Sequence, residues 1–346
     1  MFEKLLEKRG FWSKVGPCSD VVLSTRVRLG RNLSDVRFPH RQDEDDLNYI
    51  RFLTEEFVYK SDFNNCVTLC DLKDISLNDR RFLRERNIIT HEMETSENSY
   101  VIIENDENFY IMVNEEDHFR IQVIKPGFQI METYRLADRV DDELNKFVTY
   151  AYSDEFGYLT VCPSNLGTGL RISTMLHLPA LSLTGAIPEV VKNVRDAGAK
   201  IKGTLGEGSK TFGSMYQLFN RVSLGLSEVD ILEEIDEVTS RVVDMESVAR
   251  DNYFSEEAVQ LEDTVWRSMG ILRYSRHIGY TEAMDHLSNI RLGIILSILK
   301  NIELQEINDL MVNIQWSHLQ KIANMVFNDS YECDNFRANY LRMQLD

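Results

Sequence analysis

The alternation of apolar and polar residues predicts several short strands in the first part of the chain. Each alternating run has a length between four and eight residues, which is typical of strands. The sequence Asn-Asp-Glu-Asn at 105–108 separates two of the runs and indicates a hairpin. The candidate strands are residues 21–28, 99–103, 109–113 and 119–124.

A helical period of apolar residues appears between and after these strands. Residues 43–60 and 128–152 are predicted to be helices, and we expect a helix-rich passage from about residue 172 to residue 200. Met175 and His177 are therefore interpreted as positions on a helix face.

From Ser227 onward the apolar pattern becomes helical throughout. Ser227 and Asp230 form a capping-box-like start, and apolar residues then recur at spacings of three and four. Further helices are expected to begin near Ser255 and Thr281. This predicts a mixed helix and strand body at residues 1–226 and an all-helical C-terminal domain at residues 227–346, whose amphipathic helices favour a homodimer.

Composition narrows the class of protein. The 346 residues are 43% hydrophobic and 27% charged, enough for two domains, and no apolar run is long enough to span a bilayer. The charged N-terminus lacks the apolar segment of a signal peptide. Five scattered cysteines favour a reducing cytoplasm over a disulfide framework. The net charge of −18 argues against nucleic acid and is compatible with basic protein clients, although solubility alone also explains it.

One stretch, Gly-Tyr-Leu-Thr-Val-Cys-Pro-Ser-Asn-Leu-Gly-Thr-Gly-Leu-Arg at 157–171, combines a thiol, glycines and an arginine. Its glycines let a backbone approach a ligand closely, and Arg171 offers a planar fork for phosphate or carboxylate. On residue types alone, it is an anion loop beside Cys162, a thiol that is more often inert packing than chemistry.

Three other clusters carry possible chemistry. Arg26 and Arg28 share one face of a predicted strand, where two guanidiniums need an anion between them unless they are solvated. Asn-Glu-Glu-Asp-His-Phe-Arg at 114–120 places three acidic residues after an apolar strand, which is typical of a solvated turn. The glycines in 202–209 suggest a loop that closes over a ligand, or a long turn.

These clusters together resemble the phosphagen (guanidino) kinases, from about residue 12 to about residue 345. The resemblance implies an α+β catalytic domain with an antiparallel sheet flanked by helices. It implies transfer of the γ-phosphoryl group of ATP to a guanidinium, with Mg²⁺ held mainly by phosphate oxygens and no protein metal site.

The resemblance also assigns roles to residues. Glu116 is the expected base, Glu207 is the second carboxylate on the guanidinium, and Cys162 positions the substrate electrostatically. The expected ATP-binding residues are Ser24, Thr25, Arg26, Val27, Arg28, Asn87, His91, Arg120, Arg171, Ile172, Ser173, Thr174, Met175, Lys202, Gly203, Thr204, Leu205 and Gly206.

Two positions depart from the family pattern. Lys202 stands where relatives usually have an arginine, so it keeps the charge without the bidentate fork. Asn87 stands where relatives commonly have a nucleotide-contacting histidine, and His91 is a candidate substitute if its segment is helical.

The branch resembled most is the bacterial protein-arginine kinases, because the segments at 267–272 and 287–294 resemble their C-terminal region. The helical domain that precedes the arginine pair in arginine and creatine kinases has no counterpart before Arg26. This branch implies arginine residues of proteins as substrates, marking for regulated proteolysis in a stress response, an activator protein and Clp-type protease machinery.

Two other functions remain open: a kinase of free arginine or another small guanidine, and a weakly catalytic adaptor that binds phosphoarginine. The branch reads phosphoarginine through two arginines, and Cys333 replaces the first of them. Weak binding is therefore assigned to Asp334, Arg337 and Ala338.

Overall fold

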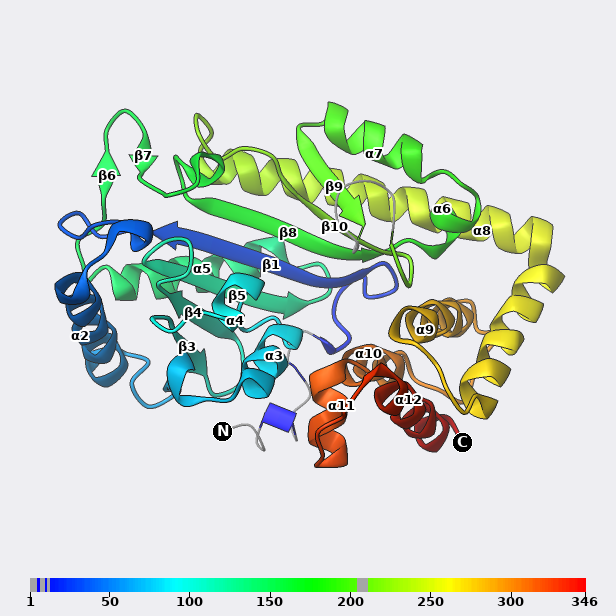
Figure 1. Cartoon of the computed structure of the whole chain (residues 1–346). Helices are drawn as coiled ribbons and strands as arrows, with labels where there is room; N and C mark the ends of the chain where they lie inside the picture. The colour runs from blue at the N-terminus through cyan, green and yellow to red at the C-terminus, as the bar shows by residue number, and fades with distance from the viewer. Residues whose placement is uncertain (1–4, 7–9, 11–12, 204–210) are drawn as a thin grey trace.

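A computed structural model describes residues 5–6, 10, 13–203 and 211–346. In the part of the chain that the structure describes, the centre is an antiparallel sheet of eight strands, seen across the middle of Figure 1. Strands β6 (Tyr152–Ser153) and β7 (Gly157–Tyr158) form a separate hairpin. The order in the large sheet is β2 (Val67–Asp71), β3 (Tyr100–Glu104), β4 (Phe109–Val113), β5 (Phe119–Pro126), β1 (Val22–Arg31), β8 (Leu170–His177), β10 (Met215–Asn220) and β9 (Ala199–Gly203).

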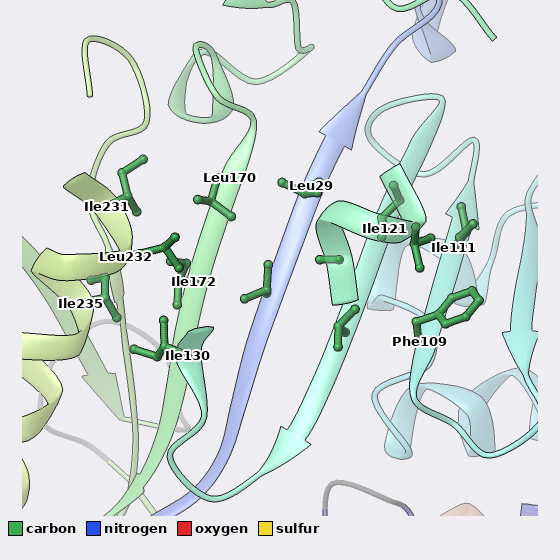
Figure 2. Packing of buried hydrophobic residues seen from close by; sticks show 14 of the residues in the cluster. Leu29, Phe109, Ile111, Ile121, Ile130, Leu170, Ile172, Ile231, Leu232 and Ile235 are labelled. Atoms are coloured by element: carbon green, nitrogen blue, oxygen red, sulfur yellow. The ribbon is translucent and has the colours of Figure 1, made fainter. Parts of the chain in front are cut away.

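One face of the sheet is apolar and covered by helices. Leu29, Ile121 and Ile172 point from three neighbouring strands into the main core, as Figure 2 shows. Helix α5 (Ile130–Leu144) and the first half of α8 (Glu228–Tyr274) cover them. Burying such apolar side chains stabilises the fold by about 1.5–3 kcal/mol each, so this face fixes the strands that carry the site.

The opposite face is covered only at its two ends. Near β4 and β5, helices α3 (Leu77–Glu85) and α4 (His91–Glu94) enclose a small core that includes Phe82 and Ile124. At the other end, the C-terminal helices pack on Leu23, Met175 and Met215. Between these two ends lie the positively charged side chains of the candidate site. The remaining helices are α2 (Glu44–Lys60), α6 (Pro179–Leu183), α7 (Ile187–Asp196), α9 (Tyr280–Ile295), α10 (Leu304–Asn313), α11 (Trp316–Ala323) and α12 (Ser330–Leu345).

Helix α8 belongs to both halves of the molecule. Its first part, including Ile231 and Ile235, packs in the core of the sheet, whereas Val265 and Met269 pack in the C-terminal helical core. Glu257 has a non-helical backbone (φ −128°, ψ 33°), and α8 bends there, as its yellow segment shows in Figure 1. The expected domain boundary at 226/227 lies at the start of α8, whereas the helix changes core near this bend.

A buried arginine ties the helical region to the sheet. Arg291 of α9 is fully buried and reaches His177 at the end of β8, with 2.7 Å between Nη1 and Nδ1. It also donates to the carbonyl oxygens of Asp20 (3.1 Å) and Ser19 and to Asn308 Oδ1 (3.2 Å). Because burial lowers the pKa of Arg291 to about 9, these acceptors are needed to hold the charge.

The predicted fold class, an antiparallel sheet flanked by helices with a helical C-terminal region, is confirmed. The predicted hairpin at 99–113 and the strand at 119–124 are present. The helix expected after residue 172 is wrong at its start, because Met175 and His177 lie on β8, a central strand paired with β1 and β10. No new helix begins near Ser255, because α8 continues through it.

Candidate active site

Four arginines lie together on the open face of three adjacent strands. Arg26 and Arg28 alternate with Val27 along β1, so both face away from the main core. Arg171 on β8 pairs directly with Arg28 in the antiparallel register. Arg120 on β5 belongs to the same cluster, because its charge lowers the pKa of both β1 arginines. All four were expected to bind ATP, and the sheet brings Arg120 and Arg171 from distant segments to the pair on β1.

The cluster is electrostatically strained without an anion. Burial, followed by the charges of Arg120 and Arg171, lowers the pKa of Arg26 to about 10. Burial and the neighbouring arginines lower the pKa of Arg28 well below its usual value. Among the described residues, the Nε atoms of Arg28 and Arg171 are buried without a hydrogen-bond partner. Such a site has the charge and the unused donors to bind a polyphosphate.

A cavity of about 470 Å³, which we call the nucleotide cavity, opens beside Arg26 and Arg28. It lies between the sheet and the C-terminal helices, and its walls include Met175, Tyr280 and other apolar side chains. Apolar walls next to a cationic end suit a ligand with a flat ring and a phosphate chain.

Asn87 and His91 also line the nucleotide cavity, from the segment around α4. His91 does lie on a helix, and its side chain is 80% exposed. Asn87 has a left-handed backbone (φ 59°), and its carbonyl oxygen accepts a bond from Gln122 Nε2 at 2.6 Å. The structure therefore brings both expected residues to the cavity. Within the part of the chain that the structure describes, neither forms a hydrogen bond with an arginine of the cluster.

Four of the residues expected to bind ATP point the other way. Thr25 and Thr174 are fully buried, and Thr25 Oγ1 donates to the carbonyl oxygen of Gly127 at 2.7 Å. Val27 and Ile172 belong to the main core. Because side chains alternate along a strand, a run of consecutive residues cannot all face one ligand. Ser24, Ser173 and Met175 do share the arginine face, and Ser173 Oγ accepts from Arg26 Nε at 3.3 Å.

Glu116 lies at the edge of this cluster, next to the cysteine. Asn165 Nδ2 donates to Glu116 Oε2 at 3.3 Å, and Cys162 hydrogen-bonds the same carboxylate. Cys162 Sγ is 3.1 Å from Ser164 Oγ. Burial, and then Asp117, raises the pKa of Glu116 above its ordinary value. A carboxylate with a raised pKa is a better proton acceptor, which suits a general base.

Glu115 has a different task from its neighbour. Its Oε2 atom accepts from Arg120 Nη1 at 2.6 Å, in a pair whose carboxylate side chain is only 3% exposed. Although burial opposes ionisation, Arg120 holds the pKa of Glu115 below its usual value. Glu115 therefore anchors one arginine of the cluster, whereas Glu116 is available to a substrate.

Asp117 connects the acidic string to the cysteine segment. Its Oδ1 atom accepts from Asn32 Nδ2 at 2.6 Å and from the backbone amide of Val161 at 2.8 Å. In return, Asn32 Oδ1 accepts from the backbone amide of His118 at 2.9 Å. These bonds hold the segment of Cys162 next to the acidic string. A structural role for Asp117 was expected, but its partners Asn32 and Val161 could not be identified because they lie far apart in the chain.

We expect Asp117→Ala to lower kcat about tenfold or more, because a buried acceptor for two donors is lost and Cys162 is released. The KM for ATP should stay close to that of the wild type, since Asp117 does not line the nucleotide cavity. Steady-state kinetics check this, and Asp117→Asn, which keeps an oxygen acceptor, should recover part of kcat. A rise in the KM for ATP alone would contradict the positioning role.

The glycines of the 157–171 stretch serve the chain itself. Gly169 has a left-handed backbone (φ 67°), and a Cβ there would lie 2.7 Å from the carbonyl oxygen of Gly30. The amide of Gly30 donates to the carbonyl oxygen of Gly169 at 3.0 Å. The expected close approach is therefore between two backbone segments, and it brings β8 against β1 so that Arg171 meets Arg28.

The positive face extends to β9 and β10. Arg171 lies over the ring of Phe219, 4.5 Å from its centroid, and Lys202 Nζ is 5.7 Å from the same centroid. Phe219 is thus a shared platform for two cations, and no sequence signal pointed to it. Gly203 ends β9. Thr204, Leu205, Gly206 and Glu207 lie outside the described residues.

The residues expected to bind phosphoarginine are on α12 and engaged inside the helical region. Arg337 is 3% exposed, donates to the carbonyl oxygens of Ile314 (2.9 Å) and Ile278 (3.0 Å), and pairs with Asp334. Ala338 is fully buried. Cys333 Sγ accepts from Arg337 Nη2 at 3.3 Å, so the cysteine fills a contact within the fold.

Comparisons with known proteins agree in both halves of the chain. Residues 50–249 match the family model for the C-terminal catalytic domain of ATP:guanido phosphotransferases, and residues 258–346 match that of the C-terminal domain of the protein-arginine kinase McsB. The two matches meet near the bend at Glu257.

The chain is similar over nearly its whole length to protein-arginine kinases. That of Caldanaerobacter subterraneus subsp. tengcongensis is 39% identical over 330 residues, covering 94% of this chain and 97% of the relative. That of Halalkalibacterium halodurans is 40% identical over 334 residues, covering 96% and 94%.

Two solved structures are similar over about 70% of the chain. The duplicated taurocyamine kinase of Schistosoma mansoni, solved with bound transition state analog components, has a TM-score of 0.61 and 25% identity, covering 71% of this chain and 36% of that one. This chain thus spans about a third of the duplicated protein. Lombricine kinase has a TM-score of 0.61 and 20% identity, covering 70% of each chain, and shares the fold.

Proposed function

The chain belongs to the ATP:guanido phosphotransferase family, and we propose that it is a protein-arginine kinase. It transfers the γ-phosphoryl group of ATP to the guanidinium of arginine residues in proteins. The observation that carries this proposal is the placement of four arginines on one sheet face beside Glu116 and Cys162. The similarity to protein-arginine kinases along both halves of the chain supports a protein substrate.

In the proposed mechanism, Arg26, Arg28, Arg120 and Arg171 bind the phosphates and stabilise the charge that develops during transfer. Glu116 orients the substrate guanidinium and accepts a proton from the attacking nitrogen. Cys162 contacts Glu116 and adds a polarisable neighbour for the cationic substrate. No covalent intermediate on the protein is required, because positioning and charge stabilisation supply most of the catalysis of phosphoryl transfer.

We propose Mg²⁺ as the ion that accompanies ATP. The donors that meet the phosphates are guanidinium groups, which bind phosphate oxygens and repel a metal, so the ion would be held by phosphate oxygens and water. Among the described residues, no group of three or more His, Cys, Asp and Glu side chains is arranged to hold a metal ion. Magnesium would neutralise phosphate charge, while the arginines would orient the phosphates of ATP.

Lys202 and the residues that follow it in the sequence would complete the phosphate site. Lys202 extends the positive face on β9, next to Arg171 and Phe219. Glu207, which lies outside the described residues, stays the proposed second carboxylate on the guanidinium. Asp334, Arg337 and Ala338 stay a proposed weak phosphoarginine site, and a ligand there would have to displace the internal bonds of Arg337.

The test is to incubate the protein with Mg²⁺-ATP and either an arginine-rich protein or free arginine, and to record ³¹P NMR spectra. We expect an acid-labile phosphorus signal on the protein substrate only. A signal on free arginine as well would indicate a small-guanidine kinase, and no signal on either would indicate a phosphoarginine-binding adaptor.

We also propose a cellular setting from family membership. The protein would act as a homodimer in the cytoplasm, respond to an activator protein and mark clients for Clp-type protease machinery in a stress response. All five cysteines are free, which supports a reducing compartment. No helix in the described part of the chain is long and apolar enough to cross a membrane.

A further inference from the structure

A second hollow of about 390 Å³, which we call the acceptor cavity, adjoins the active site. Glu115 and Glu116 form part of its wall, whereas Arg26 and Arg28 line the nucleotide cavity. Glu115 of the acceptor cavity wall pairs with Arg120, a member of the arginine cluster to which Arg26 and Arg28 belong. In-line transfer places the attacking nitrogen and the leaving group on opposite sides of the phosphoryl group. If the proposed function holds, the substrate arginine reaches Glu116 through the acceptor cavity.

The walls of the acceptor cavity carry carboxamides. Gln42 comes from the segment between Pro39–Arg41 and α2, and Asn98 comes from the segment before β3. A carboxamide has both a donor and an acceptor, as a peptide group does, so it can pair with an extended main chain. The other walls include Pro39, Leu47 and Val161, which offer apolar contact.

Asn114 links the side chain of Gln42 to the main chain of Asn98, next to Glu115 and Glu116. Gln42 Nε2 donates to Asn114 Oδ1 at 3.2 Å, and Asn114 Nδ2 donates to the carbonyl oxygen of Asn98 at 3.3 Å. Asn114 is 8% exposed and immediately precedes Glu115. Within the described part of the chain, Gln42 Oε1 and the side-chain amide of Asn98 make no hydrogen bond, so both are available to a ligand.

We propose that the acceptor cavity binds the main chain of the protein substrate on either side of the target arginine, through the carboxamides of Gln42 and Asn98. This inference rests on the proposed function and specifies its substrate contacts. Recognition of peptide groups accepts many neighbouring side chains, because every residue has the same main chain. It also separates a protein substrate from a small guanidine, which has no peptide groups to offer.

The test compares the wild type with the full-length double variant Gln42→Ala/Asn98→Ala. The substrate is a short peptide with one central arginine, and a second peptide has N-methylated amides beside that arginine. We expect the double variant to raise the KM for the plain peptide roughly tenfold, as expected for the loss of two hydrogen bonds. The KM for ATP should not change, and the wild type should discriminate against the N-methylated peptide while the double variant should not.

Asn48→Ala/Glu97→Ala is the matched control, because both residues are exposed, each adjoins a wall residue in the sequence, and neither lies in the acceptor cavity wall. Its KM for the peptide should equal that of the wild type. An active wild type whose KM for the peptide is unaffected by the carboxamide substitutions would overturn this inference alone. A wild type that phosphorylates neither peptide nor protein would overturn the proposed function and this inference with it.

Discussion

The Glu116→Gln variant should bind ATP as the wild type does and phosphorylate arginine at least ~10²-fold more slowly, within the range that a general base supplies. Glutamine keeps the shape of the side chain and can still accept from Asn165 Nδ2, so the local structure should persist. It cannot take a proton from the guanidinium, which is a very weak acid. Single-turnover phosphorylation and nucleotide titration measure the two properties separately.

Two further measurements strengthen this test. Glu97→Gln, which changes an exposed carboxylate, should leave kcat unchanged. Because burial raises the pKa of Glu116, the base is lost as the pH falls through that raised pKa. The rate should therefore decline at an acidic pH that lies above the usual range for glutamate, and the Gln variant should lack this decline. Glu116→Gln protein with a rate within about threefold of the wild type would remove Glu116 from the mechanism.

Arg28→Met should abolish most activity and at the same time stabilise the protein without nucleotide. Losing an arginine that stabilises phosphoryl transfer typically costs about 10³-fold or more in kcat. Arg28 is surrounded by Arg26, Arg120 and Arg171, and Glu115 opposes their repulsion in part. Removing this buried charge should raise the unfolding temperature by a few degrees, corresponding to about 1 kcal/mol. Calorimetric unfolding with and without Mg²⁺-ATP measures both effects, since the variant should gain little from the nucleotide.

The matched control is Arg31→Met, on the same strand. Arg31 is only 1% exposed and thus more completely buried than Arg28, but its Nη2 atom pairs with Asp141 Oδ2 at 2.7 Å. Breaking a buried pair leaves a carboxylate without its partner and typically costs about 3–5 kcal/mol. Arg31→Met should therefore lower the unfolding temperature. If Arg28→Met lowered it in the same way, the arginine cluster would not be strained in the absence of its anion.

The sequence was sufficient for the strands whose partners are close in the chain. The hairpin of β3 and β4 has a turn signal and alternating residues on both sides, so local information specifies it. The strand β8 pairs with β1 and β10, and its contacts with β1 join residues well over a hundred positions apart. Leu170, Ile172 and Leu176 do alternate, but the Ser-Thr-Met-Leu-His sequence is also compatible with a helix. Only the sheet decides between the two.

The candidate site shows the same division. Residue types and spacing left the arginines of β1 open between an anion site and a solvated pair, and the resemblance to the phosphagen kinases singled out Glu116. The bond from Asp117 to the amide of Val161 and the platform of Phe219 were not identifiable, because each depends on two segments meeting in space. Consecutive residues were all expected to bind the nucleotide. Because side chains alternate along a strand, Val27 and Ile172 point into the main core instead.

Helix α8 has a consequence for local unfolding of the molecule at equilibrium. Its backbone amides before Glu257 are covered by the sheet core, and those after it by the C-terminal core. Amide hydrogen exchange in one helix should therefore follow two different opening reactions, divided at the bend. Exchange rates along this one helix should thus report the local stability of the catalytic half and of the helical half. Because both halves share α8, unfolding of one half should also destabilise the other.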